Sequence, residues 1–239
     1  MASVDPREIE KYTKRAAVWW DLNGPQMLLH KHTTAIRIPF IVHGLASTGL
    51  ALRGLKVLDV GCGGGITSEP LALMGADVTG VDPAPALIEV AQNHQKVHAG
   101  LDIAYVCDSI EAFSDGNAAQ FDAVVCCEVL EHVTDVRSVL RASVATMKPG
   151  AHLFVTTFNR TVFSFVWAIV VMELLCGIIP RGAHKWRMFV PPEDVADILD
   201  ELGCRTVEVR GAWYSIFKRK WRESRYTGVF YGLHAVKER

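Results

Sequence analysis

Three side chains suited to acid–base or metal chemistry follow a short apolar run. Glu128, Glu131 and His132 come directly after the apolar residues 121–127. On a helical turn, residues three apart share a face. Two carboxylates and an imidazole near one point can hold Mg²⁺, which prefers oxygen ligands and keeps several waters. In a metal-free interpretation, Glu131 and His132 brace a loop, or His132 is a general base.

A second set of residues has the layout of a nucleoside-binding unit. The apolar run 57–60 predicts a buried strand, 61–65 a glycine turn, 66–74 a helix and 78–81 the next strand. That strand ends in Asp82. An acid at this place can accept hydrogen bonds from both hydroxyls of a ribose.

The glycine turn resembles motif I of the class I S-adenosylmethionine (SAM) methyltransferases, D/E-x-G-x-G-x-G. A dinucleotide site would instead need a third glycine where Ile66 stands. The resemblance implies SAM as the bound nucleoside, against the alternatives of an NAD site or a turn without ligand. The fixed positions of the motif are occupied by Asp59, Gly61, Gly63 and Gly65.

Two more charged residues are candidates for the same ligand. Asp108 ends the predicted strand 103–107, where an acid can meet the adenine amino group or cap the next segment. Arg37 lies in an otherwise apolar helical pattern over 27–45. Its guanidinium either reaches the methionine carboxylate of SAM or extends to solvent along its apolar stem.

Composition narrows the class of protein. The chain has 239 residues, half of them hydrophobic, and a formal net charge of −1. This length suits one α/β domain, and the charge gives no reason to expect nucleic acid as a partner. None of the six cysteines forms a C-x-x-C pair, so we expect reduced, mostly buried thiols. The amino end does not resemble a signal peptide.

The order of the segments predicts an α/β fold with a mostly parallel, doubly wound sheet and helices on both faces, because strands and helices alternate. Helical patterns over 5–18 and 27–45 precede the sheet, and residues 148–150 predict a turn. The remaining strands are expected at 121–127, 151–157, 206–210 and 230–236, and the remaining helices at 83–97, 136–147 and 191–202.

One domain over residues 1–239 accommodates these elements. We divide it into an N-terminal helical cap (1–50), a SAM-binding core (51–157), an apolar insertion (158–190) and the C-terminal part of the sheet (191–239).

The insertion carries a nearly continuous apolar run over 162–179. About 17–25 residues can cross a bilayer, yet the flanking strand and helix belong to one sheet, and Glu173 interrupts the run. Either a helix covers the active site, or the segment 162–187 lies in the interface of an anionic membrane. His184 then either faces the acceptor or is structural. The flanking basic and tryptophan side chains are Arg160, Arg181, Lys185, Arg187, Trp167 and Trp186.

The whole pattern resembles one family, the bacterial and mitochondrial ubiquinone-biosynthesis O-methyltransferases, which methylate polyprenyl-dihydroxybenzene intermediates. The resemblance covers nearly the whole chain. Its marks are Trp19-Trp20-Asp21-x-x-Gly24, Leu29-His30, residues 57–65, residues 128–133, Asn159 and Pro180-x-Gly182-x-His184.

The resemblance implies a mechanism and a location. A polyprenyl catechol, demethylubiquinol included, would lose a ring proton beside Mg²⁺ and attack the SAM methyl, with Glu128 and His132 as catalytic residues. Peripheral attachment to the inner membrane is implied, on the mitochondrial matrix side or the cytoplasmic face of a bacterium, beside other ubiquinone-biosynthesis proteins. By residue, SAM would contact Arg37, Gly61, Asp82 and Cys127, and Mg²⁺ would bind Glu128, Glu131 and His132.

Two alternatives remain. A metal-independent class I methyltransferase for another phenol or lipid would share most of these residues, because Glu-x-Leu-Glu-His also occurs where no metal is used. A non-catalytic methyltransferase-fold subunit that binds lipid would not need an intact glycine turn, Asp82 and Glu128.

Overall fold

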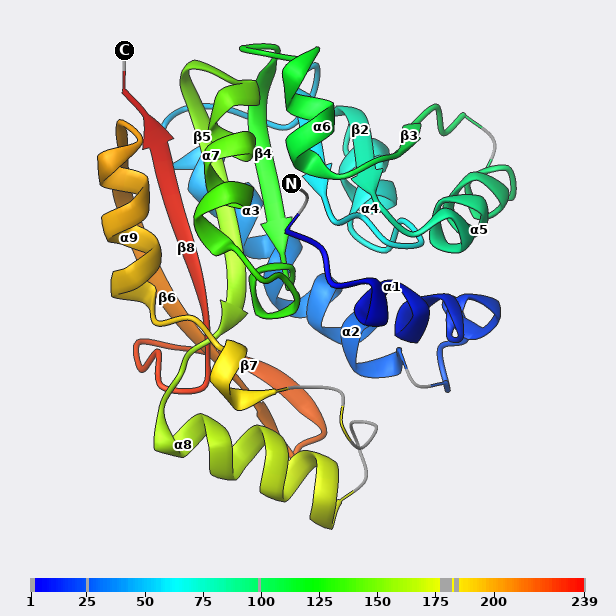
Figure 1. The fold of residues 1–239 in the computed structure, drawn as a ribbon, viewed down its shortest axis with the longest axis vertical. Coiled ribbons are helices and arrows are strands. Elements are labelled where there is room, and N and C mark those ends of the chain that lie inside the picture. The colour runs from blue at the N-terminus through cyan, green and yellow to red at the C-terminus, as the bar shows by residue number, and fades with distance from the viewer. Residues whose placement is uncertain (1–2, 25, 99, 177–181, 183–184, 239) are drawn as a thin grey trace.

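The computed structural model describes residues 3–24, 26–98, 100–176, 182 and 185–238. Its centre is an eight-stranded sheet in the order β3-β2-β1-β4-β5-β8-β6-β7 (Figure 1). Neighbouring strands from β1 to β5 pair in parallel, and β8, β6 and β7 join antiparallel. The strands are β1 (Lys56–Val60), β2 (Asp77–Asp82), β3 (Ala104–Cys107), β4 (Phe121–Cys127), β5 (Met147–Phe158), β6 (Cys204–Ser215), β7 (Lys220–Ser224) and β8 (Phe230–Lys237).

Helices cover both faces of this sheet. Alternating strand residues point to opposite faces, so Leu58 and Val60 pack with α6, α7 and α9, whereas Val57 packs with α3, α4 and α5. Both faces are therefore buried, as a parallel sheet requires. The helices are α1 (Pro6–Thr13), α2 (Met27–His32), α3 (Ile38–Ala46), α4 (Ser68–Leu73), α5 (Pro85–Gln95), α6 (Ile110–Asp115), α7 (Val136–Thr146), α8 (Val162–Ser164) and α9 (Pro192–Glu201).

Most elements expected from the sequence are present, and the α/β fold class is confirmed. The expected turn at 148–150 is wrong: these residues lie within β5 at a bulge, where the partners of Phe121 and Ala123 jump from Met147 to His152. The helix α6 and the strand β7 were not predicted. Among the described strands β7 pairs with β6 alone, at the sheet edge, and Trp221 is its single apolar residue, so its sequence has no alternating pattern.

The second N-terminal helix contains a widened turn. Residues 33–37 form a π-helical stretch (η2, Thr33–Arg37) between α2 and α3, so the helical run from Met27 to Ala46 continues as expected. A π-helical turn changes which side chains share a face, and such turns are common at functional sites. Here it ends at the buried Arg37.

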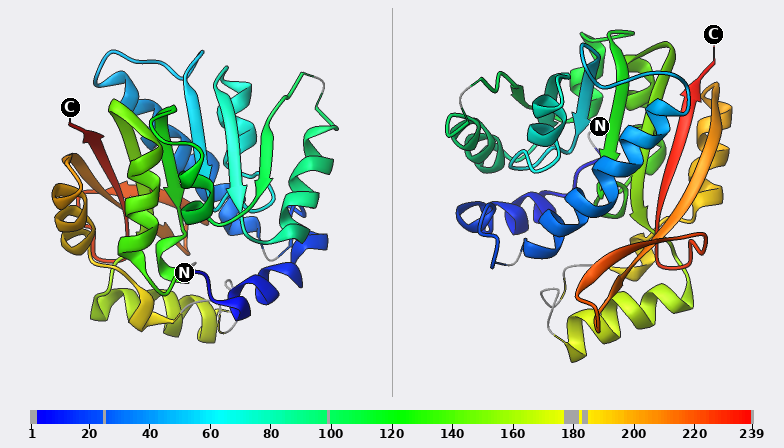
Figure 2. Two further views of the ribbon diagram at one scale, coloured as in Figure 1. Left: turned by 45° about the horizontal axis from the view of Figure 1, so that its top comes forward. Right: turned by 180° about the vertical axis from the view of Figure 1, so that it is seen from behind.

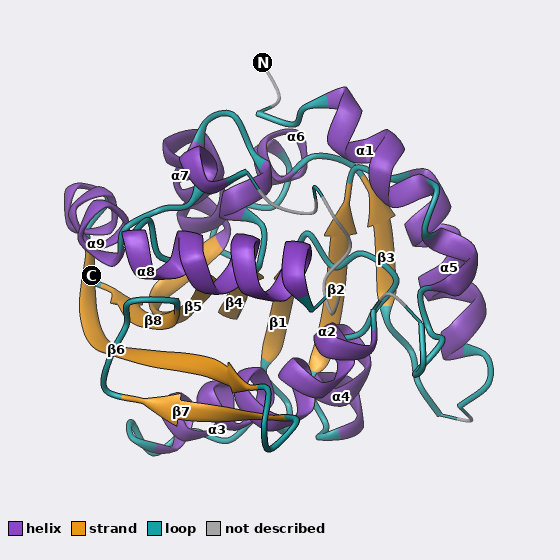
Figure 3. Cartoon of the chain, turned by 90° about the horizontal axis from the view of Figure 1, so that it is seen from below, coloured by secondary structure: helices purple, strands orange, loops and turns teal. Residues whose placement is uncertain are grey.

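The cap and the insertion lie at the same end of the sheet. Figure 2 shows the helices α1 and α2 and the insertion below the carboxyl ends of the parallel strands, whereas α3 lies against a face of the sheet. Figure 3 views this edge with the insertion, labelled α8, lying across it. The insertion continues from α8 into a π-helical stretch (η4, Phe165–Leu175). In the described part of the chain no helix has the length and apolar character needed to cross a bilayer.

Candidate active site

The glycine turn follows β1 and requires glycine at two points. Gly61 and Gly63 have φ values of +66° and +54°, a region that side chains with a Cβ rarely adopt. A Cβ on Gly61 would lie 2.5 Å from Val129, and one on Gly63 would lie 2.7 Å from Trp19. One side of the loop is therefore tightly packed, and Gly61 and Gly63 also line a cavity that a ligand can enter.

Asp82 lies beside this turn because β1 and β2 pair in register, Val60 against Val81. Its carboxylate accepts hydrogen bonds from the backbone N–H groups of Gly63 (2.9 Å) and Ala84 (2.8 Å). Burial raises its pKa to about 6 against these two donors. Each carboxylate oxygen keeps a further lone pair that can accept a ribose hydroxyl.

The other strand ends complete this edge. Asp108 follows β3 and lines the same cavity, and its carboxylate accepts from the backbone N–H of Ser109 (2.8 Å). Cys127 ends β4, is buried, and also lines the cavity. All five residues expected to contact SAM thus line one cavity: Arg37, Gly61, Asp82, Asp108 and Cys127.

The cap closes over the glycine turn through two tryptophans. Trp19 is buried against Gly63 and Gly64. Trp20 donates its indole N–H to the carbonyl of Gly64 (2.9 Å) and stacks on His94, with ring centroids 3.5 Å apart. These contacts give the sequence mark Trp19-Trp20 a physical role, because they fix the cap to the backbone of the turn.

Arg37 forms a buried bridge between the glycine-turn side and β4. Its guanidinium donates to the hydroxyl of Thr67 (2.9 Å) and pairs with the carboxylate of Glu128 (2.5 Å). Nη2 makes the contact with Glu128, whereas Nε has no hydrogen-bond acceptor among the described side chains. A buried guanidinium with an unused donor, at the wall of a cavity, is suited to an anionic ligand.

Glu128 holds this bridge from an uncommon backbone conformation. Its φ is +57°, rare for a residue with a Cβ and typical of functional sites. His32 also lies on its carboxylate, with Nδ1 at 2.8 Å. Burial opposes the charge of Glu128, but Arg37 and His32 outweigh it and lower the pKa of this carboxyl well below its ordinary value.

Glu131 and His132 point into other networks. The Glu131 carboxylate is buried and accepts from the hydroxyl of Thr157 (2.7 Å). Burial, and then the charge of Glu128, raise its pKa to about 8, so it is mostly protonated at neutral pH. His132 lies 3.2 Å by Nδ1 from Glu8 and 2.8 Å by Nε2 from the hydroxyl of Tyr12.

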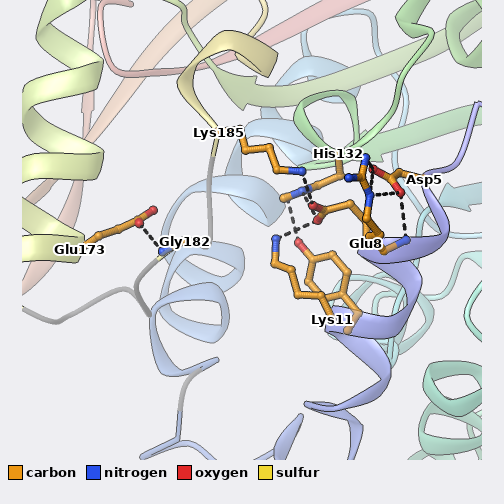
Figure 4. Close-up of polar contacts among 9 residues, drawn as sticks. Asp5, Glu8, Lys11, His132, Glu173, Gly182 and Lys185 are labelled. Atoms are coloured by element: carbon orange, nitrogen blue, oxygen red, sulfur yellow. Dashed lines mark hydrogen bonds and ion pairs between the residues drawn. The ribbon is translucent and has the colours of Figure 1, made fainter.

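Glu8 and Tyr12 were missed by the sequence analysis. Glu8 also accepts from Lys11 (2.8 Å) and Lys185 (3.4 Å), so α1, the β4 loop and the end of the insertion meet at one carboxylate (Figure 4). The hydrogen bond from His132 outweighs burial and, with Lys11, lowers the pKa of Glu8. The available signal was the spacing of Glu8 and Tyr12, which places both on one face of a helix.

The three expected Mg²⁺ ligands do not form one ligand set in this arrangement. The carboxylate of Glu128 is held by Arg37 and His32, and Glu131 is mostly neutral. Among the described residues, they are not a group of His, Cys, Asp or Glu whose ligand atoms lie within 4.8 Å of one another. The donor set therefore does not fit Mg²⁺ as placed, and the metal assignment stays a prediction.

The cavity continues from the strand edge to an apolar, aromatic half. Its volume is about 250 Å³. The insertion contributes Trp167, Ala168 and Met172 to the cavity wall. Part of it therefore covers the site, which agrees with the expectation of a helix over the active site. His184, for which both an acceptor-facing and a structural role were considered, lies outside the described residues, as does Arg181. The other apolar walls of this half are formed by Leu28, Phe158, Tyr214, Trp221, Val229 and Phe230.

Comparison with known proteins decides the family. Residues 33–209 match a family model described as a methyltransferase domain. The chain is 40% identical to the ubiquinone biosynthesis O-methyltransferase of Methylobacterium nodulans, covering 98% of this chain and 95% of that protein. The chain belongs to the ubiquinone biosynthesis O-methyltransferase family. It is also 40% identical to the mitochondrial protein of that name from Mus musculus, covering 99% of this chain and 66% of the mouse protein.

Solved structures show the same fold at low identity. The magnesium protoporphyrin IX methyltransferase of Synechocystis PCC 6803 with bound SAM has a TM-score of 0.63 and 21% identity, over 95% of this chain and 90% of that one. The N-methyltransferase NodS of Bradyrhizobium japonicum WM9, in complex with S-adenosyl-L-homocysteine (SAH), has a TM-score of 0.62 and 20% identity, over 98% of each chain. The predicted family and the class I methyltransferase fold are thus confirmed.

Proposed function

We propose that this member of the ubiquinone biosynthesis O-methyltransferase family transfers the methyl group of SAM to a ring hydroxyl of a polyprenyl catechol, demethylubiquinol included. One observation carries the proposal: a single cavity joins the strand edge that suits SAM to an apolar, aromatic half. A planar phenol with an apolar tail fits such walls, and the cap excludes water from the transfer.

In the half of the cavity that suits SAM, the residues at the strand ends have separate roles. Gly61 lets the backbone approach the cofactor, Asp82 accepts the ribose hydroxyls, and Arg37 holds the methionine carboxylate. Asp108 lies where the adenine amino group would be, and Cys127 contacts SAM through its backbone. Glu128 acts through Arg37, because the carboxylate fixes the guanidinium in place.

The acceptor half supplies a base. In the tautomer that donates Nδ1–H to Glu8, Nε2 of His132 accepts a hydrogen bond from the Tyr12 hydroxyl when no substrate is bound. A catechol hydroxyl can take the place of the Tyr12 hydroxyl, or pass its proton through it. The phenol O–H bond then breaks towards Nε2, the oxygen forms a bond to the methyl carbon, and the S–C bond breaks to leave neutral SAH.

Mg²⁺ assistance is a finer prediction, and no step of this scheme uses it. When bound near the acceptor oxygen, a divalent cation would lower the pKa of the phenol. The carboxylate of Glu128 is instead held by Arg37 and His32, and that of Glu131 accepts a hydrogen bond from Thr157. We therefore expect His132 to activate the phenol alone.

Peripheral attachment to the inner membrane is part of the proposal. The insertion covers the cavity with one face and exposes apolar side chains on the other, and an exposed apolar patch of this kind suits a lipid surface. The β6–β7 hairpin adds Phe217 beside the exposed Lys218, Arg219 and Lys220. Basic side chains around an apolar tip favour anionic lipid. Association with other ubiquinone-biosynthesis proteins stays a prediction.

Methyl transfer to a short-tailed prenyl catechol tests the function. We expect SAH and a methoxy ring from the native protein, and a loss of about 10²-fold or more in kcat for His132→Ala. The assay is repeated with EDTA, and then with Mg²⁺ and Zn²⁺ added back separately. Activity that needs Mg²⁺ would restore the predicted metal site. SAM binding without transfer would indicate another acceptor, and no SAM binding would indicate the non-catalytic lipid-binding subunit.

A further inference from the structure

A cluster of metal-binding side chains lies behind the glycine turn, outside the cavity. Glu69 is on the first turn of α4, His94 is near the end of α5, and His98 follows one turn later. Within the described residues, this is the group of three His, Cys, Asp or Glu side chains whose ligand atoms all lie within 4.8 Å of one another. Neither the sequence motifs nor the proposed reaction uses it.

The distances suit a transition metal. His94 Nδ1 lies 2.7 Å from one oxygen of Glu69, and His98 Nε2 lies 3.9 Å from the other. Tetrahedral Zn²⁺ with ligands at about 2.0–2.1 Å separates neighbouring ligand atoms by about 3.4 Å. The His94–Glu69 distance is about 0.7 Å below that separation and the His98–Glu69 distance about 0.5 Å above it, so shifts of less than about 1 Å would bring both pairs to it.

Burial and ligand type narrow the class of ion. The Glu69 side chain is 4% exposed, whereas His94 is 24% and His98 is 47% exposed. The carboxylate thus lies at the buried end of the cluster. The histidine end is open to solvent, where a water can be the fourth ligand. Two imidazoles and one carboxylate favour Zn²⁺ or Co²⁺ over Mg²⁺, which prefers oxygen ligands.

The cluster contacts the SAM site through two ligands. The backbone N–H of Glu69 donates to the carbonyl of Gly65 (3.0 Å), the last residue of the glycine turn. The ring of His94 is stacked on Trp20, with an angle of 3° between the rings, and Trp20 is hydrogen-bonded to Gly64. An ion that fixes the His94 ring would therefore also fix the face on which the cap rests.

We propose that Glu69, His94 and His98 form a binding site for Zn²⁺ or a similar divalent transition metal, whose occupancy stabilises the cap over the glycine turn. The site is separate from the predicted Mg²⁺ ligands, which lie on the loop after β4. Since EDTA also removes Zn²⁺, loss of activity on chelation has two distinguishable sources, and adding back each metal separately identifies which one acts.

Co²⁺ titration of the untagged protein tests for the site. We expect visible absorption bands of tetrahedral Co²⁺ that saturate at one ion per chain and disappear on adding Zn²⁺. His98→Ala should weaken Co²⁺ binding at least about tenfold, because it removes one of three protein ligands from a half-exposed position where folding is not at risk. His43→Ala is the matched control, since His43 is an exposed helical histidine outside the cluster.

The effect on the cap is measured separately from activity. With Zn²⁺ bound, we expect slower amide hydrogen exchange in residues 16–24 and several-fold tighter binding of SAH by calorimetry, both lost in His98→Ala. Absence of saturable Co²⁺ binding, or equal binding by His98→Ala and native protein, would overturn the site. Binding without any change in exchange or SAH affinity would overturn the coupling to the cap.

Discussion

Arg37 is the residue on which the charges of the cofactor site depend. It is buried between Thr67 and Glu128. Removing one partner of a buried ion pair lowers the stability of a protein by about 3–5 kcal/mol. We expect Arg37→Met to lower the free energy of unfolding by that order and SAH affinity by at least about tenfold. Arg37→Lys keeps the charge but loses the planar guanidinium. We therefore expect its free energy of unfolding to be closer to that of the native protein than its SAH affinity is.

Calorimetry of SAH binding and denaturant unfolding measure these two effects. Arg53→Met is the control, because Arg53 is an exposed arginine outside the cavity. Native SAH affinity in folded Arg37→Lys and Arg37→Met would show that this guanidinium does not hold the cofactor.

The Glu8–His132–Tyr12 network gives a second prediction at the same scale. Glu8→Gln keeps the size of the side chain but removes the negative charge that stabilises protonated His132. We expect kcat to fall about tenfold or more with little change in KM, and Tyr12→Phe to have a smaller effect if the substrate hydroxyl replaces that of Tyr12. Steady-state kinetics across pH checks this, with the exposed Glu10→Gln on the same helix as control. A change in KM alone would mean that Glu8 only positions the cap.

At the scale of elements, Trp19 joins the cap to the sheet. Its ring fills the space beside Gly63 and Gly64, so Trp19→Ala leaves a cavity at a buried position and costs about 3–5 kcal/mol. We expect weaker SAH binding and faster proteolysis of the first 24 residues. Trp213→Ala, at an exposed position on β6, should change neither. Equal effects of the two substitutions would argue against Trp19 as the contact that closes the cap.

The insertion makes a testable membrane surface. Val162 and Leu175 are 76% and 74% exposed at its two ends, while Ala168 and Met172 face the cavity. The double substitution Val162→Gln and Leu175→Gln should reduce co-sedimentation with phosphatidylglycerol-containing vesicles several-fold and leave SAH binding unchanged. Leu73→Gln on α4, at a position 65% exposed, is the control. Undiminished vesicle binding by the double variant would move the membrane contact elsewhere.

The elements also show what the sequence can predict. The glycine turn and Asp82 were found because their chemistry lies within about twenty-five consecutive residues, with fixed spacing between strand, turn and acid. Arg37 lines the cavity, and its role as a SAM ligand stays a prediction; its partners Thr67 and Glu128 are contacts across the fold. No local pattern specifies such pairs.

The same reason explains the network around His132. Glu8 and Tyr12 meet His132 across 124 and 120 residues of chain. The triplet Glu128, Glu131 and His132 looked like one ligand set because the three are neighbours in sequence. The left-handed conformation at Glu128 and the short 3₁₀ turn over Leu130–His132 direct their side chains to different partners.

At the scale of the whole molecule, opposing pKa shifts set the pH dependence of stability. Burial raises the pKa of Asp59 to about 7 and of Glu131 to about 8, above their unfolded values near 4. The folded state then holds protons that the unfolded state has released, so these groups lower stability as pH rises through that window. Buried His32 and His234 have lowered pKa values, so they lower stability as pH falls below about 6.5.

Between pH 6.5 and 8, His32 and His234 are mostly neutral in the folded state and lose their remaining protons in the unfolded state, whereas Glu131, with a pKa of about 8, keeps its proton in the folded state alone. We expect the free energy of unfolding to fall by about 1 kcal/mol per pH unit in this range. Glu131→Gln imitates the protonated acid and keeps an acceptor for Thr157, so it should remove most of the slope and be more stable than native protein at pH 8. Urea unfolding at pH 6.5, 7.2 and 8 measures the slope, with the exposed Glu193→Gln as control. A slope that Glu131→Gln leaves unchanged would mean that Glu131 is ionised in the folded protein, which would return it to the set of candidate Mg²⁺ ligands.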